Sequence, residues 1–193
     1  MTFLNTISKE EVTAMPKEVF SGQIVVVNTK EYLAKAIDYL STFSEIGFDT
    51  ETRPSFSKNK YYTMSLMQLS TEEVCFLIRL NKFGKFPKTL ETFLKNNNTK
   101  KIGLSLRDDF NRLLDLTKIS PNNFIDLQNY VTPFGIEELS LRKIYAILFG
   151  KKISKSQQKS NWEIELLSQS QMRYAALDAW ACLRIYQYLE HLK

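Results

Sequence analysis

Apolar and polar positions along the chain follow two periods, which predicts a mixture of strands and helices. Short apolar or β-branched runs are typical of strands, while apolar residues spaced three or four apart are typical of helices. The strands predicted in this way cover residues 23–27, 45–52, 61–70, 74–80, 102–104 and 123–127. The predicted helices cover about 29–41, 88–94, 105–116, 136–149 and 168–192.

The lengths of the connections predict how these elements are arranged. The links between 45–52, 61–70 and 74–80 are too short for a helical crossover, so these strands form an antiparallel meander, with a polar turn over 53–59. Strands and helices then alternate. We therefore expect an α/β fold with a mixed sheet, an antiparallel meander plus parallel strands, flanked by helices. Residues 1–22 lack strong periodicity and are expected to form an N-terminal extension to one domain over 23–193.

Composition narrows the class of protein. The 193 residues are 44% hydrophobic and 24% charged, as in an ordinary globular domain, and a net charge of +5 is compatible with a polyanionic partner. Cys75 and Cys182 lie in apolar surroundings and are expected to be reduced core residues of a cytoplasmic protein. The polar start predicts no signal peptide, and no apolar run suggests a membrane partner.

The scarcity of histidine limits the kinds of active site that this chain can form. The single histidine, His191, lies near the end of the chain. A Ser-His-Asp triad or a histidine-rich zinc site in the body of the fold is therefore excluded.

Two acids interrupt an apolar strand, where acids are normally depleted. In Ile46-Gly47-Phe48-Asp49-Thr50-Glu51, Asp49 and Glu51 are two residues apart and project from the same face, about 7 Å from each other along the chain. Paired carboxylates need positive charge, which a divalent cation with oxygen ligands supplies. The alternative is a strand end with two solvated acids, partnered by Arg53.

Acids also occur at two later places. Asp108 and Asp109 fall in the first turn of a predicted helix, where acids complement the helix dipole without further function. Tyr174 and Asp178 are four residues apart on the last helix, so they share a face, and alanines beside them allow another backbone to approach. The alternative for this pair is a core tyrosine and an exposed aspartate.

The order of these residues resembles the DEDDy 3′–5′ exonucleases of the ribonuclease-H-like superfamily. The pattern is Asp-x-Glu at Asp49 and Glu51, an aspartate at Asp109, and Tyr-x-x-x-Asp at Tyr174 and Asp178. Werner-type exonuclease domains and ribonuclease D catalytic domains look most similar, and the likeness covers about residues 24–189. It assigns the second motif to Asp109 rather than Asp108. Leu104 stands where ribonuclease D sometimes has a histidine.

The resemblance implies a metal-dependent 3′–5′ exonuclease that hydrolyses phosphodiesters and releases 5′-mononucleotides. It implies two divalent ions, Mg²⁺ or Mn²⁺, with Asp49 bridging both, Glu51 and Asp178 on the ion nearest the attacking water, and Asp109 on the other. Tyr174 is implied to orient that water. The expected partner is nucleic acid with a free 3′ end, DNA rather than RNA, and no obligate protein partner is visible.

Contacts with the nucleic acid are expected from apolar and basic residues. Met67 or Leu106 would wedge the terminal bases, and Trp162 would stack on a base, although a core position is its alternative. A basic run would follow the phosphates, with a solvated loop as its alternative. Its members are Arg142, Lys143, Lys151, Lys152, Lys155 and Lys159.

Two other functions compete with the nuclease. One is a catalytically weak or inactive nuclease-fold protein that binds nucleic acid or acts as a scaffold. It is disfavoured because all four acids and the tyrosine are present. The other is a calcium-stabilised structural domain, which would have no need of Tyr174 four residues before Asp178.

Overall fold

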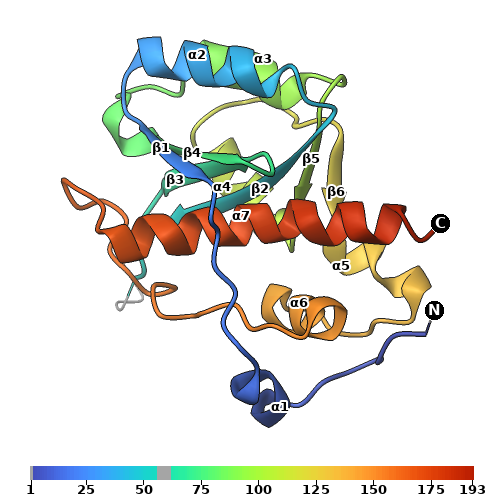
Figure 1. Cartoon of the computed structure of the whole chain (residues 1–193). Helices are drawn as coiled ribbons and strands as arrows, with labels where there is room; N and C mark the ends of the chain where they lie inside the picture. The colour runs from blue at the N-terminus through green and yellow to red at the C-terminus, as the bar shows by residue number, and fades with distance from the viewer. Residues whose placement is uncertain (1, 56–61) are drawn as a thin grey trace.

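A six-stranded mixed sheet runs through the centre of the computed structural model, which describes residues 2–55 and 62–193. Its strand order is β1-β4-β3-β2-β5-β6 (Figure 1). The expected meander is confirmed, because β3 pairs antiparallel with both β2 and β4, whereas β5 and β6 continue the sheet parallel to β2. The strands are β1 (Gln23–Val27), β2 (Glu45–Thr52), β3 (Met64–Ser70), β4 (Val74–Arg79), β5 (Lys100–Gly103) and β6 (Phe124–Asp126).

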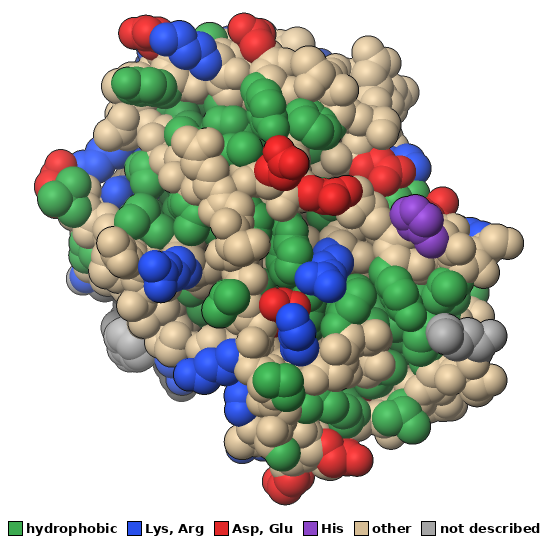
Figure 2. Space-filling view, viewed as in Figure 1, with side chains coloured by type: hydrophobic (Ala, Val, Ile, Leu, Met, Phe, Trp, Pro, Cys, Tyr) green, Lys and Arg blue, Asp and Glu red, His purple; other side chains and the backbone are tan. Residues whose placement is uncertain are grey.

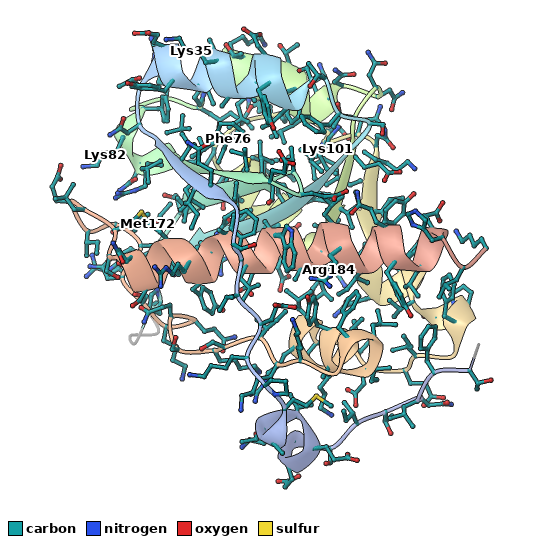
Figure 3. The ribbon with its side chains drawn as sticks, in the orientation of Figure 1. Lys35, Phe76, Lys82, Lys101, Met172 and Arg184 are labelled. Carbon is teal, nitrogen blue, oxygen red and sulfur yellow. The ribbon has the colours of Figure 1, made fainter. Side chains whose placement is uncertain are left out.

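Helices cover both faces of this sheet. The long helix α7 crosses one face, with α6 and the N-terminal α1 beyond it, and α2 and α3 cover the other face (Figure 1). Figure 3 shows Phe76 and Lys101 on the α2–α3 side. The helices are α1 (Lys9–Ala14), α2 (Lys30–Leu40), α3 (Lys88–Lys95), α4 (Leu106–Leu114), α5 (Leu127–Tyr130), α6 (Leu141–Phe149) and α7 (Gln169–Glu190). Within the described ranges, no helix is long and apolar enough to cross a membrane.

The central strand β2 sends its side chains to two different environments. Ile46 and Phe48 are buried in the cluster that α2, α3 and α4 cover, with Phe48 edge-on to Phe124 at 5.0 Å. Because side chains alternate along a strand, Gly47 and Asp49 face α7 instead. The strand therefore contributes core on one face and polar groups on the other.

Gly47 allows α7 to lie directly against the sheet. A Cβ atom built at this position would sit 1.9 Å from the backbone oxygen of Ala179, well inside contact distance. Only glycine fits without displacing the helix. The close approach matters because Asp178, the neighbour of Ala179, is thereby brought over β2.

The helix predicted over 136–149 begins later than expected. It starts at Leu141, after Ser140, and residues 137–138 instead contact the N-terminal segment. The Glu137 backbone N–H donates to the Asn5 carbonyl at 2.9 Å, and the Glu138 carboxylate accepts from the Ile7 N–H at 3.0 Å. Tertiary contacts therefore keep residues 136–140 out of the helix, although Ile136 fits the apolar spacing that predicted it.

A buried lysine explains the misplaced start of the fifth strand. The segment 96–101 reads as a polar loop, but β5 begins at Lys100, and Lys101 is fully buried. Its ammonium donates to the Asn96 and Thr99 carbonyls at 2.6 and 2.9 Å. The short α1 and α5 were not predicted either, and part of the expected turn over 53–59 lies outside the described residues.

The two cysteines and the N-terminal segment are part of the packed structure. Cys75 and Cys182 are both buried and free. Residues 16–18 exchange backbone hydrogen bonds with Lys152, and the Glu18 carboxylate accepts from the hydroxyl of buried Tyr145 at 2.7 Å. Arg184 reaches the same carboxylate at 3.5 Å (Figure 3). The segment before β1 is thus anchored to α6 and α7.

Gly47→Ala should destabilise the fold and separate Asp178 from β2. The added methyl overlaps the Ala179 carbonyl, and overpacking of this kind costs about 1–3 kcal/mol in unfolding free energy. Denaturant unfolding measures that loss, with exposed Ser120→Ala as the control. A Gly47→Ala protein as stable as wild type would show that α7 does not depend on this contact.

Candidate metal centre and active site

Three carboxylates meet where β2 passes under α7. Asp49 and Glu51 project from β2 and Asp178 from α7, and each offers an oxygen so that the three oxygens lie within 4.8 Å of one another. The strand positions two of them by alternation, and the close approach at Gly47 brings the third. The alternative of two solvated acids partnered by Arg53 is wrong. The two acids are half-buried, and Arg53 pairs with Glu163 at 3.2 Å.

The last helix presents a polar stripe to this site. Ser168 caps α7 in a reciprocal capping box with Gln171, which fixes the start of the helix. Tyr174, Asp178 and Cys182 follow at four-residue spacing and line the same cleft. The alternative of an exposed aspartate is therefore wrong, since Asp178 is 7% exposed.

Asp109 lies beside the three clustered carboxylates but outside their group. It comes from the first turn of α4, and its carboxylate accepts a hydrogen bond from the Thr50 hydroxyl. Its negative charge still acts on Asp49 and Glu51. The structure thus brings Asp109 to the edge of the site, held by a residue of β2.

A hydrogen-bonded turn fixes the start of the helix that carries Asp109. Ser105 has the left-handed φ of 60°, and its N–H and that of Leu106 donate to the Asp126 carboxylate at 3.0 and 2.9 Å. The same carboxylate accepts from the Gln128 N–H at 3.0 Å. Asp126 therefore ties the β5–α4 turn to the end of β6. The sequence signal for this role, an acid at the end of a strand, was not recognised as functional.

The surroundings of Asp49, Glu51 and Asp178 disfavour ionisation of all three carboxyl groups at once. Burial, reinforced by the neighbouring acids, raises the pKa of Asp49 well above its ordinary value and that of Glu51 to about 10. Burial raises the pKa of Asp178 to about 7, although hydrogen bonding from Tyr174 opposes this. No ion pair within residues 2–55 and 62–193 involves these three carboxylates.

This donor set fits a divalent cation. Hard cations such as Mg²⁺ take oxygen ligands from carboxylates and retain positions for water or phosphate oxygens. The three residues supply only carboxylate oxygens, form no ion pair among the described residues, and open onto a cleft. A cation would lower the pKa of each carboxyl by opposing the repulsion.

The cleft has a volume of about 390 Å³ and a mixed lining. Backbone and side-chain polar groups surround its mouth, and Lys155 at that mouth lowers the pKa of Asp178. The cleft is also lined by residues that the sequence analysis did not predict as site residues. They are Thr50, Leu104, Ser105, Gln128, Leu139, Ser140, Leu141, Ile153, Ser154, Gln158 and Cys182.

Three expected nucleic-acid contacts are wrong because the side chains are buried. Met67 and Leu106 are 0% and 4% exposed and pack in the cluster on the α2–α3 side of the sheet. Trp162 is 0% exposed, and its ring lies 6.1 Å from that of Tyr174, so it supports the tyrosine from within the core. None of the three lines the cleft.

The basic residues do not act as one group. Lys155 and Arg142 line the cleft, whereas Lys151 pairs with Glu18 at 3.1 Å and Lys143 with Glu138 at 2.8 Å. The Lys152 ammonium donates to the Thr13 carbonyl, and Lys159 is exposed. Figure 2 shows basic side chains scattered over the α7 face rather than gathered in a stripe. Four of the six residues of this run thus anchor neighbouring segments or lie apart from the cleft.

The sequence was compared with known families and proteins. A family model described as 3′–5′ exonuclease matches residues 24–192. The mouse bifunctional 3′–5′ exonuclease/ATP-dependent helicase WRN is 32% identical over 187 residues, covering 92% of this chain and 13% of the mouse protein. The exonuclease mut-7 homolog of Aedes aegypti is 28% identical over 193 residues, covering 88% of this chain and 27% of that protein. The chain thus spans a minor part of these relatives.

Solved structures share the fold. The EXO domain of Aedes aegypti Nibbler superposes with a TM-score of 0.79 at 25% identity, covering 91% of this chain and 94% of that one. Escherichia coli RNase D superposes with a TM-score of 0.78 at 23% identity, covering 88% of this chain and 44% of that one. The expected ribonuclease-H-like architecture is therefore confirmed.

Asp178→Asn should raise stability in EDTA, and the gain should grow with pH. A carboxyl whose pKa rises on folding contributes stability that is present at low pH and lost as pH increases through the folded value, here about 7. The variant carries no charge there, so its melting temperature should match wild type near pH 4 and exceed it by about 5 °C at pH 8.

Thermal melts in EDTA across this range measure the difference, with exposed Asp38→Asn as a control that follows wild type. Millimolar Mg²⁺ should stabilise wild type more than the variant, because only wild type keeps the full ligand set. A variant that melts with or below wild type at pH 8 in EDTA would contradict the buried-repulsion account.

Proposed function

Because the chain belongs to the 3′–5′ exonuclease family whose model matches residues 24–192, we propose that it is a metal-dependent hydrolase that removes nucleotides from the 3′ end of nucleic acid. The observation that carries the proposal is the group of Asp49, Glu51 and Asp178, whose oxygens lie within 4.8 Å in a cleft next to Tyr174. A tyrosine at this place is a feature that a purely structural cation site would not require.

The proposed ligand set has two parts. Asp49, Glu51 and Asp178 would hold one divalent ion, and Asp49 together with Asp109 would hold a second. Asp109 lies close enough for its charge to act on Asp49, which supports the second position. When bound, the ions supply Lewis acidity that activates the attacking water and stabilises the departing oxygen.

The protein's own groups position the reaction. Burial and the nearby acids raise the pKa of Tyr174, so its hydroxyl stays protonated at neutral pH and serves as a hydrogen-bonding group rather than a base. It would hydrogen-bond the attacking water beside Asp178. Lys155, at the mouth of the cleft, is placed to contact a phosphate, and Arg142 lies on the same lining.

The proposed reaction is a hydrolysis at the last phosphodiester. The water oxygen forms a bond to phosphorus, the bond from phosphorus to the 3′ oxygen breaks, and that oxygen takes up a proton. The products are a 5′-mononucleotide and a strand shortened by one residue, again with a free 3′ hydroxyl. DNA is retained as the expected substrate, with RNA of the same sequence as the alternative.

A nuclease assay on end-labelled strands tests the proposal. With Mg²⁺ or Mn²⁺, a 5′-labelled strand should give a ladder that shortens with time, and a 3′-labelled strand should release labelled mononucleotide first. EDTA, a 3′-phosphate block and Asp49→Asn should each abolish cleavage. Matched DNA and RNA strands decide between the two substrates.

Internal cuts, or first release of a 5′ label, would contradict the proposed polarity. Binding of strands without any cleavage would instead favour the scaffold function, provided that the Asp49→Asn protein binds them equally well. Equal cleavage by wild type and Asp49→Asn would show that the site lies elsewhere.

Tyr174→Phe should lower the hydrolysis rate without weakening metal binding. Positioning of this kind is typically worth about 10²–10⁴ in rate, and we expect the lower end because the cations provide most of the activation. Single-turnover rates at saturating Mg²⁺ measure the effect. Tyr186→Phe is the matched control, since that hydroxyl bonds Lys100 away from the cleft. Equal rates for Tyr174→Phe and wild type would leave Tyr174 a packing role only.

A further inference from the structure

A glutamine with no hydrogen-bond partner lies buried in the middle of the sheet. Gln68 of β3 is 0% exposed, and neither its Nε2 nor its Oε1 atom has a partner among the described residues. An unpaired buried amide destabilises a folded protein, and such groups are rare in native structures. An apolar side chain of similar size would stabilise this position more than glutamine does. The amide therefore needs an explanation other than stability.

The sheet register places this glutamine beside the carboxylate cluster. Gln68 is directly opposite Asp49 in the β2–β3 ladder and opposite Leu77 in the β3–β4 ladder. Residues opposite one another project from the same face, with Cβ atoms about 4.5–5.5 Å apart. Leu66 and Leu77 on this face pack in the cluster that includes α7 residues, so the Gln68 side chain lies under α7 next to Asp49.

Asp49 has unused capacity to accept hydrogen bonds. The contact that lowers its pKa is a hydrogen bond from the Thr50 backbone N–H, which leaves most of the acceptor positions of the carboxylate free. A lysine or arginine at position 68 would neutralise Asp49 and compete with a cation. A neutral amide can orient the carboxylate and leave its charge available.

We infer that Gln68 is a positioning residue whose amide donates a hydrogen bond to the Asp49 carboxylate when a cation occupies the site. The inference rests on the proposed function, because Asp49 is the residue proposed to hold both cations. Residues that hydrogen-bond to metal-ligating carboxylates fix their orientation, and their loss typically costs 10–100-fold in metal affinity or activity. Glutamine would thus be kept at position 68 for its effect on Asp49, although it stabilises the core less than an apolar side chain would.

Gln68→Met separates this role from simple core filling, because the two roles predict different combinations of results. Methionine keeps the length of the side chain and removes both polar atoms, so the variant should melt at or above wild type in EDTA under either role. If Gln68 positions Asp49, Mn²⁺ affinity measured by calorimetry without nucleic acid should fall about 10–100-fold. The single-turnover cleavage rate should fall as well.

Met67→Leu is the matched control. It is a volume-conserving change in the same strand, on the face away from Asp49, and should leave Mn²⁺ affinity and rate unchanged. Gln68→Leu provides a second apolar replacement should methionine pack poorly.

The outcomes distinguish this inference from the proposed function. A wild-type protein that binds Mn²⁺ and cleaves, together with a Gln68→Met protein of equal Mn²⁺ affinity and rate, would overturn the role of Gln68 alone. A wild-type protein that binds no Mn²⁺ and cleaves nothing would overturn the proposed function and this role with it. Weaker Mn²⁺ binding by a fully folded Gln68→Met protein supports the inference.

Discussion

Repulsion among buried carboxylates is the constraint on which this structure depends. Asp49, Glu51 and Asp178 share one site with no side-chain cation in ion-pair contact in the described parts of the chain, and burial raises the pKa of all three. Bringing like charges out of water costs free energy that folding must supply from elsewhere. A cation with oxygen ligands would offset this cost, which is the physical basis of the proposed metal centre.

The surrounding fold is arranged to hold this unfavourable group in place. Gly47 lets α7 rest against β2, and the capping box at Ser168 fixes where that helix begins. The Asp126 carboxylate ties down the turn that leads to Asp109 by accepting hydrogen bonds from two of its backbone N–H groups. These restraints come from different strands and helices, so the geometry of the site depends on the packing of the whole sheet rather than on one loop.

The sequence predicted the parts of this arrangement that depend on local pattern. The bounds of β1 and β2 and the antiparallel meander follow from the apolar pattern and from the lengths of the connections, and they agree with the structure. What the sequence did not predict depends on tertiary contact. The start of α6 is displaced by contacts with the N-terminal segment. The start of β5 was missed because its buried Lys101 is a polar residue of the kind expected in a loop.

The same distinction applies within the site. Spacing and family resemblance pointed to the acids and Tyr174, and the structure brings Asp49, Glu51, Asp178 and Tyr174 to one cleft. Which apolar and basic residues would contact nucleic acid could not be predicted, because this depends on the face each side chain takes. Met67 and Trp162 turned out to be buried, and Lys151 pairs with Glu18. The roles of Gln68 and Asp126 become visible only once strands are paired.

The most direct test of the central claim is to locate the cations themselves. Crystals grown with Mn²⁺ and a nucleoside monophosphate would give anomalous-difference peaks at bound manganese. The account predicts two peaks about 4 Å apart on either side of the Asp49 carboxylate, one of them against Glu51 and Asp178 and the other toward Asp109. Peaks absent from this cluster, or manganese bound only at other acids, would contradict the claim that the buried carboxylates form a metal centre.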